Sequence, residues 1–146
     1  MSFTVRRTLL ALSAAACATA PPAAGPEALC GCWIERRGEQ TVTQRWFPRR
    51  GGWQGDELTY FQSGAEPEAV RWRLRPDGAD GWLMCMVELT MASGPPCWRA
   101  VFGPGVSEGE GDRWVEIETA PETLRIVYVS AGDRMVTYDG RRDGCD

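Results

Sequence analysis

Short apolar runs separated by turn-forming residues are the feature that most limits how this chain can fold. From Leu29 onward, stretches rich in β-branched and aromatic residues alternate with breaks of Gly, Pro, Asp and Ser, and no stretch has a convincing helical period. The pattern predicts nine strands, at residues 31–36, 41–47, 53–61, 69–75, 81–89, 97–102, 113–119, 123–130 and 134–139. Consecutive strands joined by short turns form an antiparallel meander, which removes its exposed edges most simply by closing into a barrel. We therefore expect an all-β fold, a small antiparallel β-barrel of about 8–10 strands.

Period-two alternation indicates which faces of the strands point inward. In residues 70–75, Val70, Trp72 and Leu74 share one face and three Arg share the other. In residues 114–119, two aliphatic residues alternate with Glu116 and Glu118, which predicts that both carboxylates face solvent. The run 123–130 is apolar on both faces, so we expect another element to lie over it.

The first 20 residues have the composition of an export signal. Two Arg precede a short apolar run at residues 8–16, and small residues follow at Ala16, Ala18 and Ala20. The run is too short to span a membrane, which needs about 20 apolar residues. Residues 21–28 are rich in Pro and Ala without periodicity, which is typical of a linker, so the folded domain is expected at residues 29–146.

Cys17 has two interpretations. The segment from Ala14 to Cys17 resembles the lipobox of bacterial lipoproteins, in which the Cys is acylated and anchors the protein on the periplasmic side of a membrane. Alternatively, the signal is an ordinary secretory one and Cys17 is discarded with it. Both interpretations predict an exported protein, located in the periplasm.

Charge and missing residue types exclude several functions. The chain contains no His and no Lys, so imidazole bases, Ser-His-Asp triads and Schiff-base lysines are absent. Without the first 20 residues, 14 Arg stand against 20 Asp and Glu. An acidic domain repels phosphate backbones, so we expect no nucleic-acid partner. No pattern indicates an oligomeric state.

Ordered motifs resemble a known family. Gly31-x-Trp33 is similar to the opening of lipocalins and fatty-acid-binding proteins, the calycin group. Leu29-x-Gly-x-Trp, Gln-Arg-Trp at 44–46, the segment 48–55, and Pro121 followed by Arg-Ile-Val-Tyr at 125–128 resemble a bacterial family of exported domains of unknown function. The resemblance covers about residues 29 to 140. It implies a lipocalin-like barrel and no established catalytic residues.

The same resemblance implies how the barrel is closed. In lipocalin-like barrels the Trp of G-x-W, here Trp33, plugs the closed end. An Arg near the C-terminus often stacks on that Trp as a cation–π contact. Arg141 or Arg142 is expected to do so here, which makes Gly31, Trp33 and one of these two arginines the expected barrel-closure residues.

The cysteines predict a disulfide framework, because exported domains meet an oxidising compartment. Cys85 and Cys97 are equidistant from Met91, so a hairpin turning there would place them opposite each other, within disulfide reach. Cys145 is expected to pair with Cys30 or Cys32, because the first and last strands of a closed barrel are neighbours. If Cys17 is acylated or lost, one thiol is left over. A metal site at Cys30 and Cys32 would need further thiolates or carboxylates, so we expect no metal and no cofactor.

Three functional hypotheses follow, and the first is preferred. A non-catalytic binding module for a small apolar ligand or lipid would use Trp72, Met84 and Met86 to line a cavity above Trp33. A structural or assembly protein of the cell envelope would have a filled barrel and an exposed apolar patch. A carboxylate-dependent hydrolase would draw on Glu116 and Glu118 of one strand or on Asp56 and Glu57 of another, and it would need Glu116 or Glu118 to point into a concave pocket. We do not expect an enzyme.

Overall fold

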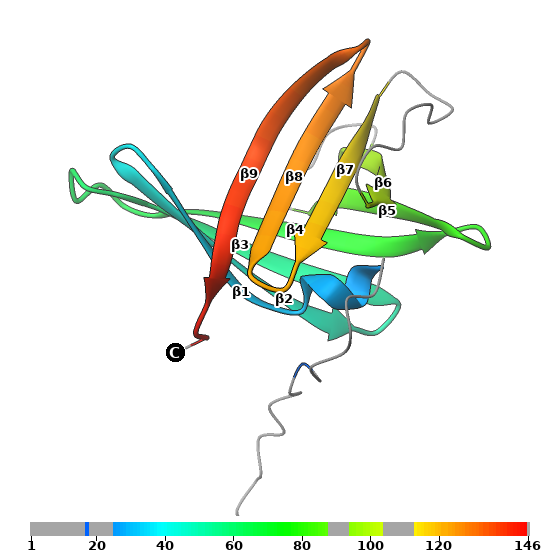
Figure 1. Cartoon of the computed structure of the whole chain (residues 1–146), viewed down its shortest axis with the longest axis horizontal. Coiled ribbons are helices and arrows are strands. Elements are labelled where there is room, and N and C mark those ends of the chain that lie inside the picture. Colours follow the sequence, from blue (N-terminus) through cyan, green and yellow to red (C-terminus); the bar gives the residue numbers. More distant parts are fainter. Residues whose placement is uncertain (1–16, 18–24, 88–93, 104–112, 146) are drawn as a thin grey trace, which may run out of the picture.

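The protein is a closed nine-stranded barrel, seen here in a computed structural model that describes residue 17 and residues 25–87, 94–103 and 113–145. Within these residues the strands follow the chain order around the barrel. They are β1 (Gly31–Arg37), β2 (Gln40–Arg49), β3 (Gly52–Phe61), β4 (Glu68–Asp77), β5 (Gly81–Met86), β6 (Cys97–Phe102), β7 (Arg113–Ala120), β8 (Thr123–Ser130) and β9 (Asp133–Asp143). The predicted all-β barrel is confirmed, and Figure 1 shows β7 to β9 crossing the strands of the N-terminal half at a steep angle.

Strand boundaries differ from the predicted ones mainly at two places. β5 ends at Met86 rather than at residue 89, and residues 88–93 lie outside the described part of the chain. β9 extends four residues beyond the predicted end, to Asp143. The apolar pattern stops at Tyr138, but backbone pairing with β1 continues through Arg141, Arg142 and Asp143. Backbone pairing at a barrel seam does not require apolar side chains, which explains the difference.

One pair of strands is parallel, contrary to the predicted all-antiparallel order. β6 and β7 run in the same direction, whereas the other neighbouring pairs, including β1 with β9, are antiparallel. The physical reason is parity: an odd number of strands cannot close with strict alternation, so at least one neighbouring pair must be parallel. The chain meets this requirement at residues 103–112, which join β6 to β7. Apart from Gly103, that predicted surface loop lies outside the described residues.

The predicted inward face of β4 is confirmed. Leu74 is buried and Trp72 packs against the core, whereas Arg71 and Arg75 are exposed. The core consists of inward residues from every strand except β3, together with Leu29 of the entering segment: Leu29, Trp33, Val42, Trp46, Leu74, Met84, Ala100, Val115, Ile117, Leu124, Ile126 and Tyr138. A single interior cluster therefore holds the two halves of the barrel together.

The chain enters the barrel through a short turn of helix. Residues Pro26–Leu29 form a 3-10 helix, labelled η1, with Pro at its start and with Pro26 and Leu29 buried. The end of the expected linker is therefore part of the packed structure. The expected export signal, apart from Cys17, and linker residues 21–24 lie outside the described residues. Among the described residues, no helix has the length and apolar character needed to cross a lipid bilayer.

Glu116 is buried, so the prediction that this carboxylate faces solvent is wrong. Its side chain points away from the core residues Val115 and Ile117, yet its residue exposure is 0%. Arg134 of β9 reaches over it with two hydrogen bonds, of 2.9 and 2.5 Å, and Trp114 Nε1 donates a third at 3.1 Å. Three hydrogen bonds from Arg134 and Trp114 satisfy the carboxylate, and the alternating pattern on β7 alone could not show these partners.

The outer face of β8 is buried in the same region. Val127 and Val129 are each 2% exposed, although they lie on the opposite face from the core residue Ile126. In the strand register Val127 is paired with Glu116, and Val129 with Trp114. The double-sided apolar pattern of β8 thus corresponds to an inner core face and an outer face beside the Glu116–Arg134 ion pair.

The Glu116–Arg134 pair predicts a stability difference that depends on pH. The hydrogen bonds from Arg134 hold the pKa of Glu116 below its ordinary value of 4.5. Because the folded pKa is the lower one, the pair stabilises the fold above pH 4.5, and its contribution is lost as the pH falls through the folded pKa. Glu116→Gln should lower the free energy of unfolding by about 1–2 kcal/mol at pH 7, with the deficit shrinking in acid.

Urea unfolding followed by Trp fluorescence at several pH values would measure this difference. Glu118→Gln is the matched control, because Glu118 lies two residues along the same strand and its ion pair with Arg125 is longer, at 3.7 Å, and more exposed. The control should lose about 0–0.5 kcal/mol. Equal losses for the two variants, or a Glu116→Gln deficit independent of pH, would contradict the assignment.

Candidate ligand-binding cavity

The barrel contains a cavity of about 340 Å³ that is open on one side. This volume falls in the range of small-molecule sites, which run from about 300 to 1,000 Å³. The lining is mainly aromatic and aliphatic with a few polar groups: Gln44, Glu57, Trp72, Met84, Trp98, Val115, Ile126, Tyr128, Met135, Thr137 and Tyr138. An apolar wall with few convergent polar groups is the usual composition of a ligand pocket.

Strand register brings three aromatic rings to one wall. Met84 of β5 is paired with Trp98 of β6, which places Trp98 beside the inward face of β4 and β5. The Trp72 and Trp98 ring centroids are 6.3 Å apart and tilted by 54°. Trp98 and Tyr128 meet edge to face, with centroids 6.1 Å apart and planes at 86°. Rings in these orientations present faces and edges in several directions rather than one flat stack.

Polar side chains form a connected chain on β2 to β4. Trp46 Nε1 donates to Gln44 Oε1 at 2.9 Å, and Gln44 Nε2 donates to Glu57 Oε2 at 2.6 Å. Trp72 Nε1 donates to the same Glu57 oxygen at 3.3 Å. The buried Gln44 amide donates one hydrogen bond and accepts one, and together with Trp72 it holds Glu57 in place from two strands. The carboxylate is therefore a positioned group of the cavity wall.

Tyr138 contributes a buried hydroxyl to the same region. The residue is 1% exposed, and no described residue makes a hydrogen bond with its hydroxyl. Burial raises the pKa of Tyr138 far above its ordinary value, and the carboxylates of Glu35 and Glu57 add to the shift. The hydroxyl stays protonated at neutral pH and can donate or accept a hydrogen bond. Gly140 allows this placement, because a Cβ there would lie 2.6 Å from the Tyr138 oxygen.

The cavity opens to solvent beside the first residues of β9. Met135 lines it and is 58% exposed, and the neighbouring lining residue Thr137 is also exposed. Lining residues on β2, β4 and β7 are more deeply buried. A ligand can therefore enter past Met135 and reach the aromatic wall.

Two of the three residues predicted to line a pocket do so. Trp72 and Met84 line the cavity, whereas Met86 is half-buried at the last position of β5 and is not part of its wall. Gln44, Glu57 and Tyr138 were not predicted as cavity residues. The sequence could have indicated Gln44, because it lies on the same inward face as Val42 and Trp46, where a polar residue is unexpected.

Neither Glu116 nor Glu118, the two carboxylates on which the hydrolase hypothesis depends, faces this cavity. Glu116 lies on the outer face of β7 and pairs with Arg134, and Glu118 pairs with Arg125. The hydrolase hypothesis required one of the two to point into a concave pocket. That requirement is not met at the cavity described here.

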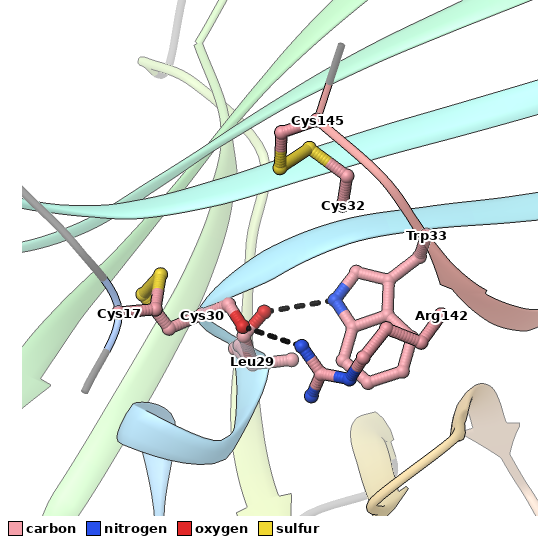
Figure 2. Close-up of a disulfide and its surroundings, with 7 residues drawn as sticks. All are labelled: Cys17, Leu29, Cys30, Cys32, Trp33, Arg142 and Cys145. Atoms are coloured by element: carbon pink, nitrogen blue, oxygen red, sulfur yellow. Dashed lines mark hydrogen bonds between the residues drawn. A yellow bond between two sulfur atoms is a disulfide. The ribbon is translucent and has the colours of Figure 1, made fainter. Parts of the chain in front are cut away.

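The opposite end of the barrel is closed by Trp33 and Arg142. Trp33 is fully buried, and the guanidinium carbon of Arg142 lies 4.2 Å from its ring centroid. Trp33 Nε1 donates to the Leu29 carbonyl at 2.8 Å, while Arg142 donates to the carbonyls of Cys30 at 3.1 Å and Pro121 at 2.7 Å. Figure 2 shows the guanidinium lying across the indole ring. Of the two arginines considered, Arg142 makes the stack.

All six cysteines, each among the described residues, are in disulfides. Cys85 is joined to Cys97, its register partner, with Cα atoms 4.0 Å apart. Cys145 is joined to Cys32 across the seam between β1 and β9 (Figure 2). Cys17 is joined to Cys30. The leftover thiol is expected only if Cys17 is acylated or lost, whereas here Cys17 is present and forms the third disulfide with Cys30.

Fold and site together define a class: a small, disulfide-linked, closed all-β barrel with an internal apolar cavity that contains one carboxylate. In comparisons with protein-family models, curated proteins and solved structures, nothing matches this chain. The functional argument therefore depends on the geometry of the cavity and of the closed end.

Gly31 is expected to be coupled energetically to Arg142. Gly31 has a φ of 127°, and a Cβ there would lie 2.6 Å from an Arg142 Nη atom. Gly31→Ala should lower the free energy of unfolding by about 2 kcal/mol, from backbone strain and from displacement of the stacked guanidinium. In an Arg142→Ala background the same change should cost about 1 kcal/mol less, as measured by urea denaturation in a double-mutant cycle.

Gly51→Ala provides the control for backbone strain alone. Its φ is 79°, and a Cβ there would meet nothing within 4 Å. It should destabilise the barrel equally in both backgrounds. Additive effects of Gly31→Ala and Arg142→Ala would show that the stack does not depend on the glycine.

Proposed function

We propose that this barrel is a non-catalytic binding module for a small apolar or amphipathic ligand. The observation that carries the proposal is the cavity of about 340 Å³, whose wall combines three aromatic rings, aliphatic side chains and a fixed carboxylate. A barrel of this size can instead fill its interior with side chains. The volume left open beside Trp72, Trp98 and Tyr128 supports binding over a purely structural role in the envelope, which would require a filled barrel.

The closed end supports a lipocalin-like assignment within this proposal. The Gly31-x-Trp33 motif opens β1, and Arg142 of the last strand stacks on the tryptophan. Membership of the calycin group, and of the bacterial family of exported domains with an L-x-G-x-W start, is part of the proposal. The lipocalin-like assignment places the ligand inside the barrel rather than on its outer surface.

Export to the periplasm is also part of the proposal. Three disulfides are compatible with an oxidising compartment. The sulfur of Cys17 cannot be both a disulfide partner of Cys30 and the thioether of a lipid anchor. We therefore favour cleavage before Cys17 without acylation, after the small residues Ala14 to Ala16, so that Cys17 stays with the folded domain.

Filling the cavity should abolish binding of an apolar ligand. Met84→Trp adds a large ring at a buried lining position, whereas Met86→Trp adds the same ring on the same strand outside the wall. Titration with the neutral dye N-phenyl-1-naphthylamine, followed by its fluorescence, should give saturable binding for the wild type and Met86→Trp. Affinity should fall at least about tenfold for Met84→Trp, because the occupied volume is no longer available.

Urea denaturation of both variants separates loss of the cavity from loss of the fold. Met84→Trp should remain cooperatively folded with a cost of about 1–3 kcal/mol. A wild type that shows no saturable binding, or a folded Met84→Trp that binds as well as Met86→Trp, would overturn the binding proposal.

The processing proposal predicts a specific intact mass. Full-length chain expressed in an exporting bacterium and recovered unreduced should begin at Cys17, carry no acyl groups and be lighter by two hydrogens per disulfide than its reduced form. Cys30→Ser should expose one thiol that reacts with iodoacetamide, at Cys17. A diacylglycerol-modified Cys17, or a chain that begins after it, would contradict the proposal.

A further inference from the structure

Within the described part of the chain, the hydrogen-bond partners of the Glu57 carboxylate are neutral side chains. Its Oε2 accepts hydrogen bonds from the Gln44 amide at 2.6 Å and from the Trp72 indole at 3.3 Å. Among the described residues it forms no ion pair, whereas its neighbour Asp56 pairs with Arg71. Two neutral donors orient the carboxylate and leave its charge without a protein counter-ion.

Glu57 is the one charged side chain in the described lining of the cavity. The nearby Arg37 is already engaged, because it donates to the Glu35 carboxylate and to the Thr137 carbonyl. An uncharged apolar ligand would remove water from Glu57 without replacing its interactions, and an anionic ligand would be repelled. A cation would supply the missing counter-charge.

The aromatic wall also favours a positively charged ligand. Trp72 reaches Glu57 through its indole nitrogen, and Trp98 and Tyr128 continue the wall at ring separations of 6.3 and 6.1 Å. Rings set at large angles to one another can surround a compact cation with several π faces, which attract positive charge through the ring quadrupole. Aromatic rings beside a carboxylate are the arrangement that binds alkylated ammonium groups.

We propose that the cavity is a site for organic cations, binding a protonated amine or quaternary ammonium group on an apolar body. The cationic group lies between Glu57 and the rings of Trp72 and Trp98. The apolar body packs on Met84, Val115 and Ile126, and enters past Met135. This inference depends on the proposed binding function and specifies the chemical class of its ligand.

An isosteric pair of ligands isolates the contribution of charge. Phenyltrimethylammonium and tert-butylbenzene have the same shape, and only the first is charged. Isothermal titration calorimetry, supported by quenching of Trp fluorescence, should show the cation binding wild-type protein about tenfold or more tightly than the neutral isostere. The preference should weaken at high salt.

Glu57→Gln tests the carboxylate, and Asp56→Asn is its matched control. The glutamine keeps a side-chain oxygen to accept from Gln44 and Trp72 but carries no charge. Glu57→Gln should reduce the preference for phenyltrimethylammonium at least about tenfold while tert-butylbenzene binds as before. Asp56→Asn removes an acid from the outer face of the same strand and should leave both affinities unchanged.

Binding of the neutral isostere distinguishes the possible failures. If neither ligand binds wild-type protein, the proposed binding function fails and this inference fails with it. If tert-butylbenzene binds and the cation binds no better, only the cation assignment is overturned. Equal loss of cation binding in Glu57→Gln and Asp56→Asn would also overturn it, because general acidity rather than the Glu57 carboxylate would then explain the attraction.

Discussion

The stack of Arg142 on Trp33 is the contact on which the closed barrel depends. β1 and β9 are paired over only three residues, so the seam has few backbone hydrogen bonds of its own. Arg142 adds a cation–π contact at 4.2 Å and two hydrogen bonds to carbonyls of other segments. The Cys32–Cys145 disulfide holds the same seam covalently. The side chains around Arg142 therefore provide the stabilisation that a longer series of backbone hydrogen bonds between β1 and β9 would otherwise provide. The same side chains also plug one end of the interior.

The plug at one end of the barrel determines where the open volume of the interior lies. The bulky residues Trp33, Trp46 and Leu29 fill the closed end, so the remaining volume lies among the aromatic rings further along the barrel. Polar groups placed there are partly shielded from bulk water, so their interactions with a bound ligand are strengthened. The hydrogen bonds from Gln44 and Trp72 hold the Glu57 carboxylate in the wall before any ligand binds.

Strand alternation predicted most of the barrel, but little of its polar chemistry. The inward phase of Val70, Trp72 and Leu74 follows from residue type, because apolar side chains must share the buried face. The same alternation predicts that Glu116 faces solvent. The prediction fails because the pattern on β7 contains no information about Arg134 of β9, which supplies the counter-charge. The link from Gln44 to Glu57 likewise depends on the register of β2 with β3, which spacing alone does not determine.

The parallel pairing of β6 with β7 decides where the chain ends lie relative to the cavity. It reverses the direction of the last three strands, so that β1 begins and β9 finishes beside the plugged end, while Met135 lies near the start of β9 (Figure 1). Any attachment made through residues before Gly31 or after Asp143 would hold the molecule by its base. A tethered copy would present its opening outward, free to sample the surrounding solution.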